Sequence, residues 1–385
     1  MRINKQLACV TLRRGAVVAK EAAGRARPGR APAPAGRRAR PRQAEVARLA
    51  GVSQATVSLV LSGRDLATGR PISAETRAKV LDAAHSLGYV PDPAASRLAA
   101  ARNNLLGVFS FTATFPTDVR HSYYPFLVGV EQEAAAQGYD LVLFTGSSTG
   151  GAGAGGAGAL NRVRLADGCL FLGRHAPSDE LRRLVADDFP VVHVGRRDEP
   201  EGLAWVGADY VSASREVVTA LAGLGHRRVL LVREDDDAPA STDRERGFLE
   251  GLAASGLPAG PEALFRSGDP RGDLTADRVR AWVADGVTAF VAEETDTGAA
   301  WRALRAAVDA AGLDCPGQVS LALLGSPPAD LADGPEPMGF DIPRPALGAE
   351  AVRLLATRIA GGPAEGTLVA CAFRAGATAG PPAVP

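Results

Sequence analysis

Apolar residues recur through residues 43–101 at the three- and four-residue spacing of short amphipathic helices. Gly51 is a stop signal for the first predicted helix, and Ser53 is a capping residue for the second. A third predicted helix begins after Ser73 and ends at Gly88. Three short helices with a glycine turn between the first two predict a helix-turn-helix. The positions expected to face its core are Val46, Leu49, Ala50, Val57, Val60, Leu61, Ala78, Leu81, Ala84 and Leu87.

The pattern changes at Leu105 to apolar runs of strand length that alternate with helical segments. The predicted strands cover residues 105–110, 140–144, 168–172, 190–194, 229–232, 289–291 and 319–323. Helical segments such as 126–137 and 214–224 lie between them. Buried strands that alternate with helices predict doubly wound parallel sheets. Such sheets bind ligands at the carboxyl ends of their strands.

Residues 1–42 are basic, rich in Ala, Pro and Gly, and without apolar periodicity. A segment of this composition cannot bury enough surface to fold, so we expect a disordered extension. It could hold DNA nonspecifically, or it could be an extended or mis-assigned start of the chain. Behind it we expect a helix-turn-helix domain at 43–91, a short helical linker at 92–104 and an α/β core at 105–385.

Basic and acidic residues are distributed unequally between the N-terminal 104 residues and the predicted α/β core. Lys and Arg total 43 and so do Asp and Glu, which makes the whole chain neutral. Residues 1–104 nevertheless carry 19 basic and 6 acidic side chains, whereas residues 105–385 carry 24 basic and 37 acidic ones. A basic end and an acidic core indicate two tasks, one of them at an anionic surface.

Several classes of protein are disfavoured by the sequence. No apolar run approaches the 18 residues of a membrane span, and the N-terminus lacks the apolar core of a secretion signal, so we expect a cytoplasmic protein without a membrane partner. The four cysteines show no CxxC spacing, and we expect reduced, mostly buried thiols. The five histidines form no HExxH or other ligand pair, and no Walker A sequence occurs. We therefore expect no metal, cofactor or catalytic site.

A glycine-rich run at residues 153–158 formally matches GxGxxG after a strand. It lies in a low-complexity Gly/Ala segment, and no acidic residue ends a strand about 20 residues further on. A flexible loop is the favoured interpretation over a dinucleotide site.

The second helix of a helix-turn-helix enters the major groove with its N-terminal residues. The candidate DNA-binding residues at that position are Ser53, Gln54, Ala55, Thr56 and Ser58. They combine a cap able to contact phosphate, an amide able to bind adenine through two hydrogen bonds, and small side chains that allow close approach. The alternative is the solvated face of an ordinary three-helix cluster.

Four segments strengthen the DNA-binding interpretation because they resemble the LacI/GalR family of bacterial transcriptional regulators. They are residues 45–58 (EVARLAGVSQATVS), 72–81 (ISAETRAKVL), 87–91 (LGYVP) and 93–98 (PAASRL). The resemblance covers nearly everything after Arg42 and implies a hinge helix followed by a periplasmic-binding-protein-like core of two doubly wound subdomains. It also implies that Leu98 wedges into the minor groove and kinks the duplex. Simple linker packing is the alternative for Leu98.

The resemblance continues in the core, where residues 224–229 (LGHRRV) match the family's step into the next strand. Asp209 is interpreted as a carboxylate that begins a helix. Arg244 matches an arginine that contacts effector in family members, and a surface ion pair is its alternative. The other effector-binding candidates implied by the resemblance are Tyr123, Tyr124, Arg196 and Glu293.

Three departures from the family pattern concern specificity. Glu293 and Glu294 replace the usual Asn-Asp, residues 323–326 (LLGS) replace the usual Gly-Phe-Asp-Asp, and Leu59 stands where many relatives carry Arg. Because the lost aspartate commonly holds ligand hydroxyls in the family, an ordinary sugar effector does not follow from the resemblance.

Together these features predict a homodimeric transcriptional repressor that binds a near-palindromic operator. A small-molecule effector in the core would alter its affinity for operator DNA. The alternatives are a solute-binding protein without a DNA role, which would need a signal peptide, and an enzyme on a doubly wound fold, which would need a catalytic constellation.

Overall fold

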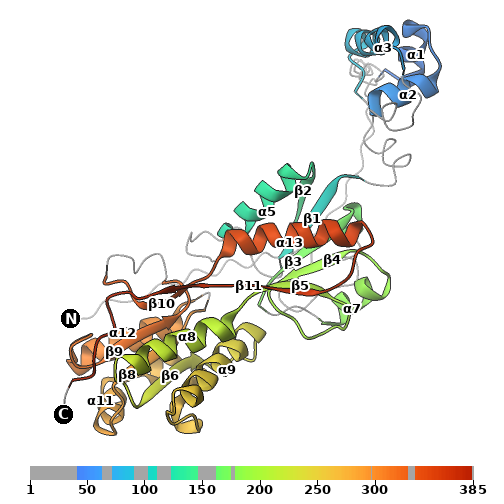
Figure 1. Ribbon diagram of the computed structural model, residues 1–385. Coiled ribbons are helices and arrows are strands. Elements are labelled where there is room, and N and C mark those ends of the chain that lie inside the picture. Colours follow the sequence, from blue (N-terminus) through green and yellow to red (C-terminus); the bar gives the residue numbers. More distant parts are fainter. Residues whose placement is uncertain are drawn as a thin grey trace, which may run out of the picture. The chain divides into compact units, whose positions relative to one another are not determined.

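The computed structural model describes residues 41–62, 72–90, 103–110, 123–145, 162–174, 178–295, 297–327 and 334–383. The chain divides into two compact units, one ending at Ser96 and one beginning at Arg97, and each is described by itself (Figure 1). Residues 1–40 of the predicted extension, the wedge residue Leu98 and the glycine-rich run at 153–158 lie outside the described residues.

The first unit contains the three predicted helices. They are α1 (Gln43–Ala50), α2 (Gln54–Ser62) and α3 (Ala74–Leu87). Gly51 and Gly88 end α1 and α3 in the left-handed conformation, with φ of 67° and 61°. Ser73 caps α3 by accepting a hydrogen bond from the backbone N–H of Thr76. The starts and stops predicted from the sequence are therefore confirmed.

The predicted inward face is wrong for parts of α1 and α3. Leu49 is 57% exposed and Leu81 is 48% exposed, and Ala78 is exposed as well. Val80 is fully buried in their place, beside Ala83 and Ala84. Alanine and aliphatic residues lie on more than one side of α3, so the periodicity leaves the face open and packing against α1 selects it.

The second unit contains two sheets, each with six strands among the described residues. In the first sheet the order is β11-β5-β4-β3-β1-β2 and all pairs are parallel. Its strands are β1 (Leu105–Ser110), β2 (Asp140–Thr145), β3 (Gly168–Leu172), β4 (Val191–Val194), β5 (Ala204–Ala208) and β11 (Gly366–Val369).

The second sheet has the order β12-β10-β9-β8-β6-β7, parallel except where β12 runs antiparallel to β10. Its strands are β6 (Val229–Glu234), β7 (Leu264–Ser267), β8 (Ala289–Glu293), β9 (Ser320–Leu324), β10 (Met338–Asp341) and β12 (Ala372–Arg374). Every strand predicted from the sequence is present. The strands that sequence reasoning missed, β5, β7, β10, β11 and β12, are short and include polar or glycine positions.

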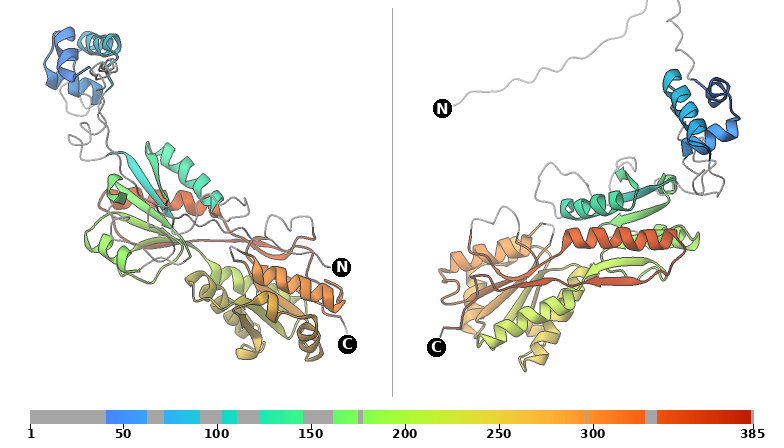
Figure 2. Two further views of the ribbon diagram at one scale, coloured as in Figure 1. Left: turned by 180° about the vertical axis from the view of Figure 1, so that it is seen from behind. Right: turned by 45° about the horizontal axis from the view of Figure 1, so that its top comes forward.

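Helices cover both faces of each sheet, as Figure 2 shows from two further directions. They are α5 (Tyr124–Ala136), α7 (Ser178–Ala186), α8 (Tyr210–Gly223), α9 (Pro239–Ala254), α10 (Pro270–Asp273), α11 (Ala276–Ala284), α12 (Ala299–Ala311) and α13 (Arg344–Ile359), with short 3₁₀ turns η2 (Arg162–Leu165) and η3 (Pro261–Ala263). Alternate strand residues enter different cores: Leu170 packs with the cluster around α13, and Phe171 packs with α7. Burial on both faces explains why the strands are apolar throughout.

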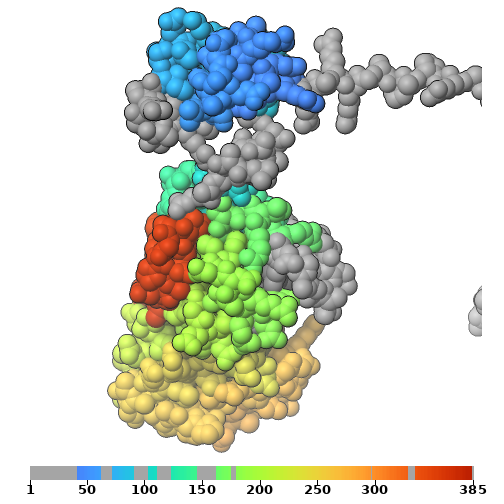
Figure 3. Space-filling model, turned by 90° about the vertical axis from the view of Figure 1, so that its right-hand side faces the viewer, coloured from blue at the N-terminus to red at the C-terminus, as the bar shows by residue number. Residues whose placement is uncertain are grey.

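The two sheets belong to two subdomains that the chain joins three times within the described residues. It passes from β5 to α8, returns from β10 to α13, and passes again from β11 to β12. Because β11 completes the first sheet and α13 packs against it late in the sequence, neither subdomain is a continuous segment. Figure 3 shows α13, in red, along the side of the first subdomain. The predicted core of two doubly wound subdomains is confirmed.

Helices α5 and α13 approach each other closely through glycine. A Cβ atom at Gly129 would overlap the carbonyl oxygen of Pro345, and one at Gly348 would overlap that of Phe126. Only residues without a side chain allow this contact. Within the described residues, no helix combines the length and the apolar character that crossing a bilayer requires.

Candidate functional site

The N-terminal turn of α2 carries the candidate DNA-binding residues. The Ser53 hydroxyl accepts a hydrogen bond from the Thr56 backbone N–H at 3.1 Å and shares one with the Thr56 hydroxyl at 2.9 Å, which confirms Ser53 as the cap. Gln54, Ala55 and Ser58 are exposed with Ser53, and Thr56 is partly buried. Val57 and Val60 turn inward to the helical core. The polar face of α2 is thus held outward by burial of the opposite face.

A cavity of about 130 Å³ lies between the two sheets of the core. Its wall includes residues that follow β3, β4 and β8, such as Arg174, Arg197 and Glu294, together with the first turns of α9. These are the carboxyl ends of parallel strands, where ligands bind in doubly wound folds. The position predicted for the ligand site from the strand pattern therefore coincides with a real cavity.

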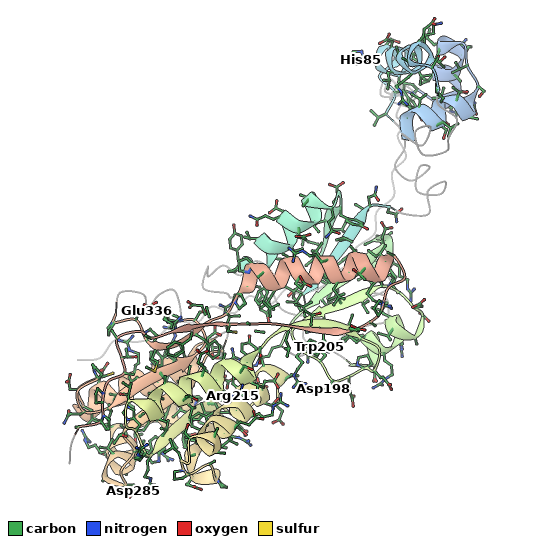
Figure 4. The ribbon with its side chains drawn as sticks, viewed as in Figure 1. His85, Asp198, Trp205, Arg215, Asp285 and Glu336 are labelled. Carbon is green, nitrogen blue, oxygen red and sulfur yellow. The ribbon has the colours of Figure 1, made fainter. Side chains whose placement is uncertain are left out.

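Ion pairs connect the two subdomains across this cavity. Arg174, after β3, lies 2.6 Å from the Asp236 carboxylate and donates a hydrogen bond of 2.6 Å to the Ser241 hydroxyl. Arg196, after β4, lies 2.6 Å from the carboxylate of Asp243 on α9. Arg196 also pairs with Asp198, which lies on the side of the first sheet nearest α9 (Figure 4). These contacts join the two subdomains by polar groups that water or a ligand could replace.

Arg244 is buried on the cavity wall and has several partners. Its guanidinium is 3.8 Å from the centre of the Tyr210 ring, and its Nε donates to the Leu324 carbonyl oxygen at 2.8 Å. Glu294 receives Arg244 at 3.3 Å and Arg344 at 2.5 Å, so one carboxylate bridges two arginines. Arg244 is 3% exposed, which rules out the surface ion pair considered as its alternative.

Arg197 is held by neutral acceptors. Its Nη2 donates to the carbonyl oxygens of Gly173 and Arg174 at 2.8 and 2.7 Å, and its Nε donates to His193 Nε2 at 3.3 Å. His193 Nδ1 lies 2.9 Å from the Gly195 carbonyl oxygen, which fixes that nitrogen as the protonated one. Burial, and next the charge of Arg197, lower the pKa of His193 to about 3, so the ring is neutral.

The structure places only some of the predicted effector-binding residues on the cavity wall. Tyr123, Arg196 and Arg244 line the cavity. Tyr124 is 68% exposed and is absent from the wall. Glu293 is also absent from the wall, because β8 continues through it and turns its side chain to the buried hydroxyl of Ser241. Burial raises the pKa of Glu293, although nearby arginines act against that shift.

Sequence reasoning missed several charged residues of the wall. They are Arg174, Arg197, Asp243, Glu294 and Arg344. A usable signal was present for three of them, because Arg174, Arg197 and Glu294 closely follow predicted strands. Asp243 and Arg344 come from helices and reach the cavity only through the packing of the subdomains. Within the described ranges no group of three His, Cys, Asp or Glu side chains could hold a metal ion.

Two family models match the chain. "Bacterial regulatory proteins, lacI family" matches residues 44–92, and "Periplasmic binding protein-like domain" matches residues 218–375. The first covers the helical unit, and the second covers the subdomain of the second sheet with parts of the first.

The chain is also similar to individual regulators. It is 30% identical over 332 residues to the HTH-type transcriptional regulator CelR of Thermobifida fusca, covering 84% of this chain and 94% of CelR. It is 27% identical over 237 residues to catabolite control protein A of Priestia megaterium, covering 60% of this chain and 66% of that protein.

Solved structures agree with these similarities. A CelR–cellobiose complex superimposes with a TM-score of 0.57 at 26% identity, over 88% of this chain and all of that one. The lac repressor dimer bound to operator and an anti-inducer superimposes with a TM-score of 0.66 at 18% identity, over 88% of this chain and 99% of that one, and supports the fold alone. The exposed N-terminal turn of α2, the two doubly wound subdomains and a 30% identity over most of both chains agree, and the protein belongs to the LacI family of DNA-binding transcriptional regulators, which are not enzymes.

Proposed function

We propose that the protein represses transcription as a homodimer on a near-palindromic operator, and that a small-molecule effector in the core cavity changes its affinity for that DNA. The observation that carries the proposal is a cavity at the strand ends of both sheets, in a chain that also carries an exposed, capped α2. A regulator of this kind works in the cytoplasm, at the DNA.

The contribution of α2 is direct contact with the major groove. Gln54 is exposed in the first turn, where its side-chain NH2 can donate to N7 of adenine and its carbonyl oxygen can accept from the N6 amino group as a bidentate pair. Ala55 and Ser58 leave room for close approach, while the Ser53 side chain is engaged in capping. Two such helices in a symmetric dimer would contact two half-sites about one helical turn apart.

The effector is proposed to act on the relation between the two subdomains. Arg174 and Arg196 of the first subdomain are held to Asp236 and Asp243 of the second. A ligand that replaces or adds to these contacts binds one arrangement of the subdomains more tightly and shifts the population toward it. The cavity residues proposed to contact it are Tyr123, Arg196, Arg244 and Glu294.

The linker is proposed to transmit this change to the DNA. By resemblance to the family, residues 93–98 form a helix on the operator and Leu98 enters the minor groove. The cost of unstacking a base step is then offset by contacts that the bent duplex allows.

Sequence-selective binding is tested with duplexes recovered by genome-wide mapping of bound sites. Fluorescence anisotropy compares the recovered duplex with a scrambled duplex at several salt concentrations. We expect a preference for the recovered sequence that persists as salt weakens both complexes, because phosphate contacts alone carry no sequence information. Equal affinity for the two duplexes would exclude specific regulation.

The role of Gln54 is tested with Gln54→Ala. We expect a loss of about 1–3 kcal/mol on the recovered duplex and weaker discrimination at one base pair of each half-site. His85→Ala, an exposed change on α3, is the matched control. An unchanged base preference in Gln54→Ala would remove Gln54 from the contact set.

A further inference from the structure

Five arginines of the described residues line the cavity, and four of them lie within ion-pair distance of a carboxylate. Arg174 pairs with Asp236, Arg196 with Asp243, and Arg244 and Arg344 with Glu294. Arg197 has no carboxylate within ion-pair distance among the residues that the structure describes. Arg197 is therefore a positive charge on the cavity wall that pairs with no carboxylate of the described residues.

The hydrogen bonds of Arg197 show which of its atoms remain available. A guanidinium has five N–H donors. The Nε donor goes to His193, and the two Nη2 donors go to the carbonyl oxygens of Gly173 and Arg174. No described residue accepts from Nη1, so two donors of a fully charged group remain at the cavity. The acceptors that hold the other three are neutral and cannot balance its charge.

The surroundings fix this guanidinium in place before any ligand arrives. His193 is 1% exposed and Gly195 constrains its tautomer, so Nε2 offers a lone pair to Arg197. Two backbone carbonyls at the end of β3 fix the plane of the group. A half-buried cation held by three acceptors loses little rotamer freedom on binding an anion, which favours a tight charge-assisted contact.

We infer that the effector of this protein is a small anionic molecule whose carboxylate or phosphate group binds Arg197, with His193 as the residue that positions the guanidinium. This inference rests on the proposed effector-binding function and names its ligand class. Neutral groups of the same molecule would face Tyr123, Phe126 and Leu347, which supply the apolar part of the wall. A neutral sugar alone would leave the Arg197 charge desolvated and unpaired, which is costly.

The inference is tested by isothermal titration calorimetry of the full chain with matched pairs of ligands. The pairs are D-glucose with D-gluconate and with D-glucose 6-phosphate, D-galactose with D-galactonate, and glycerol with glycerol 3-phosphate, together with inorganic phosphate and sulfate. We expect at least one anion to bind more tightly than its neutral counterpart. Comparison of the gluconate and phosphate arms separates carboxylate from phosphate recognition.

The variant Arg197→Gln tests whether Arg197 is the group that binds the anion. We expect it to raise the Kd of the preferred anion at least about tenfold and to remove the advantage over the neutral partner. Arg183→Gln removes the same charge from the exposed surface of α7 and should leave the Kd unchanged. Arg197→Lys, which keeps the charge but loses the planar fork, should recover part of the affinity and guards against a folding defect in Arg197→Gln.

Three outcomes would overturn the inference: binding of no anion in the panel, equal or tighter binding of the neutral partners, and an anion preference that survives in Arg197→Gln. The titrations contain no DNA. A failure of operator binding would therefore contradict the proposed function separately, and it would leave the result for the ligand class intact.

Discussion

The buried histidine beside Arg197 should make the stability of the core depend on pH from about 6.5 downward, so that the dependence begins above the range where carboxylates titrate. His193 is 1% exposed, and its pKa is lowered from 6.5 to about 3 by burial and by the neighbouring Arg197 charge. The unfolded chain takes up a proton on this residue near pH 6.5, whereas the folded chain does not. Acidification below pH 6.5 therefore favours the unfolded state.

The magnitude follows from the two pKa values. Each pH unit between them costs about 1.4 kcal/mol of unfolding free energy. Lowering the pH from 7 to 4.5 should remove about 2.7 kcal/mol through His193 alone, and the full contribution is present only above pH 6.5. His226, whose pKa is also lowered by burial, adds a loss of the same sign.

Urea unfolding followed by tryptophan fluorescence measures this effect. All three tryptophans, Trp205, Trp282 and Trp301, lie in the core, so their signal reports that unit. We expect His193→Asn to be less stable than the wild type at pH 7 and to have a shallower dependence on pH between 6.5 and 4.5. The exposed His85→Asn should keep the wild-type slope.

Only the difference in slope identifies the titrating group, because the substitution also removes hydrogen bonds to Gly195 and Arg197. If His193→Asn and the wild type lose stability in parallel from pH 7 to 4.5, His193 is protonated in the folded state and the reasoning fails. A protonated His193 would be unable to accept a hydrogen bond from Arg197 at Nε2.

Two further predictions concern local structure. Ser53→Ala removes the cap of α2 and should destabilise the helical unit by about 1 kcal/mol in thermal melts followed by circular dichroism, whereas Ser58→Ala should not; equal melting of both variants would contradict the capping role. Gly129→Ala places a methyl group against the Pro345 carbonyl oxygen and should cost the core about 1–3 kcal/mol in urea. Gly223→Ala, whose added Cβ meets nothing within 4 Å, should be neutral or stabilising, so a neutral Gly129→Ala would refute the close contact.

The local signals of the sequence were sufficient for the ends of the first helices and for the strands with continuous apolar runs. Glycine at 51 and 88 and serine at 53 and 73 act through their own backbone and side-chain chemistry, which needs no distant partner. Asp209 likewise caps α8 by accepting from the Ser212 N–H at 3.0 Å, as its position before the predicted helix indicated. Strands buried on both faces were predicted because their apolar runs are continuous.

The spacing of apolar residues did not identify the buried face of a helix where more than one face carries apolar residues. Leu81 and Val80 are adjacent and both apolar, yet only Val80 is buried, because contact with α1 selects the face. The same limit applies in the site. Glu293 and Glu294 are neighbours of one type, but strand alternation turns Glu293 to Ser241 and leaves Glu294 between two arginines.

The sequence by itself determined that this chain joins a helix-turn-helix to a doubly wound core and that the candidate ligand site lies at strand ends, because spacing, capping residues and buried runs are local properties. Only the tertiary structure decided the charges of that site. Whether an arginine is neutralised depends on carboxylates brought from distant segments: Asp243 reaches Arg196 from α9, and Glu294 joins Arg344 to Arg244. Arg197 is adjacent to Arg196 and of the same residue type, and it differs only because folding surrounds it with neutral acceptors.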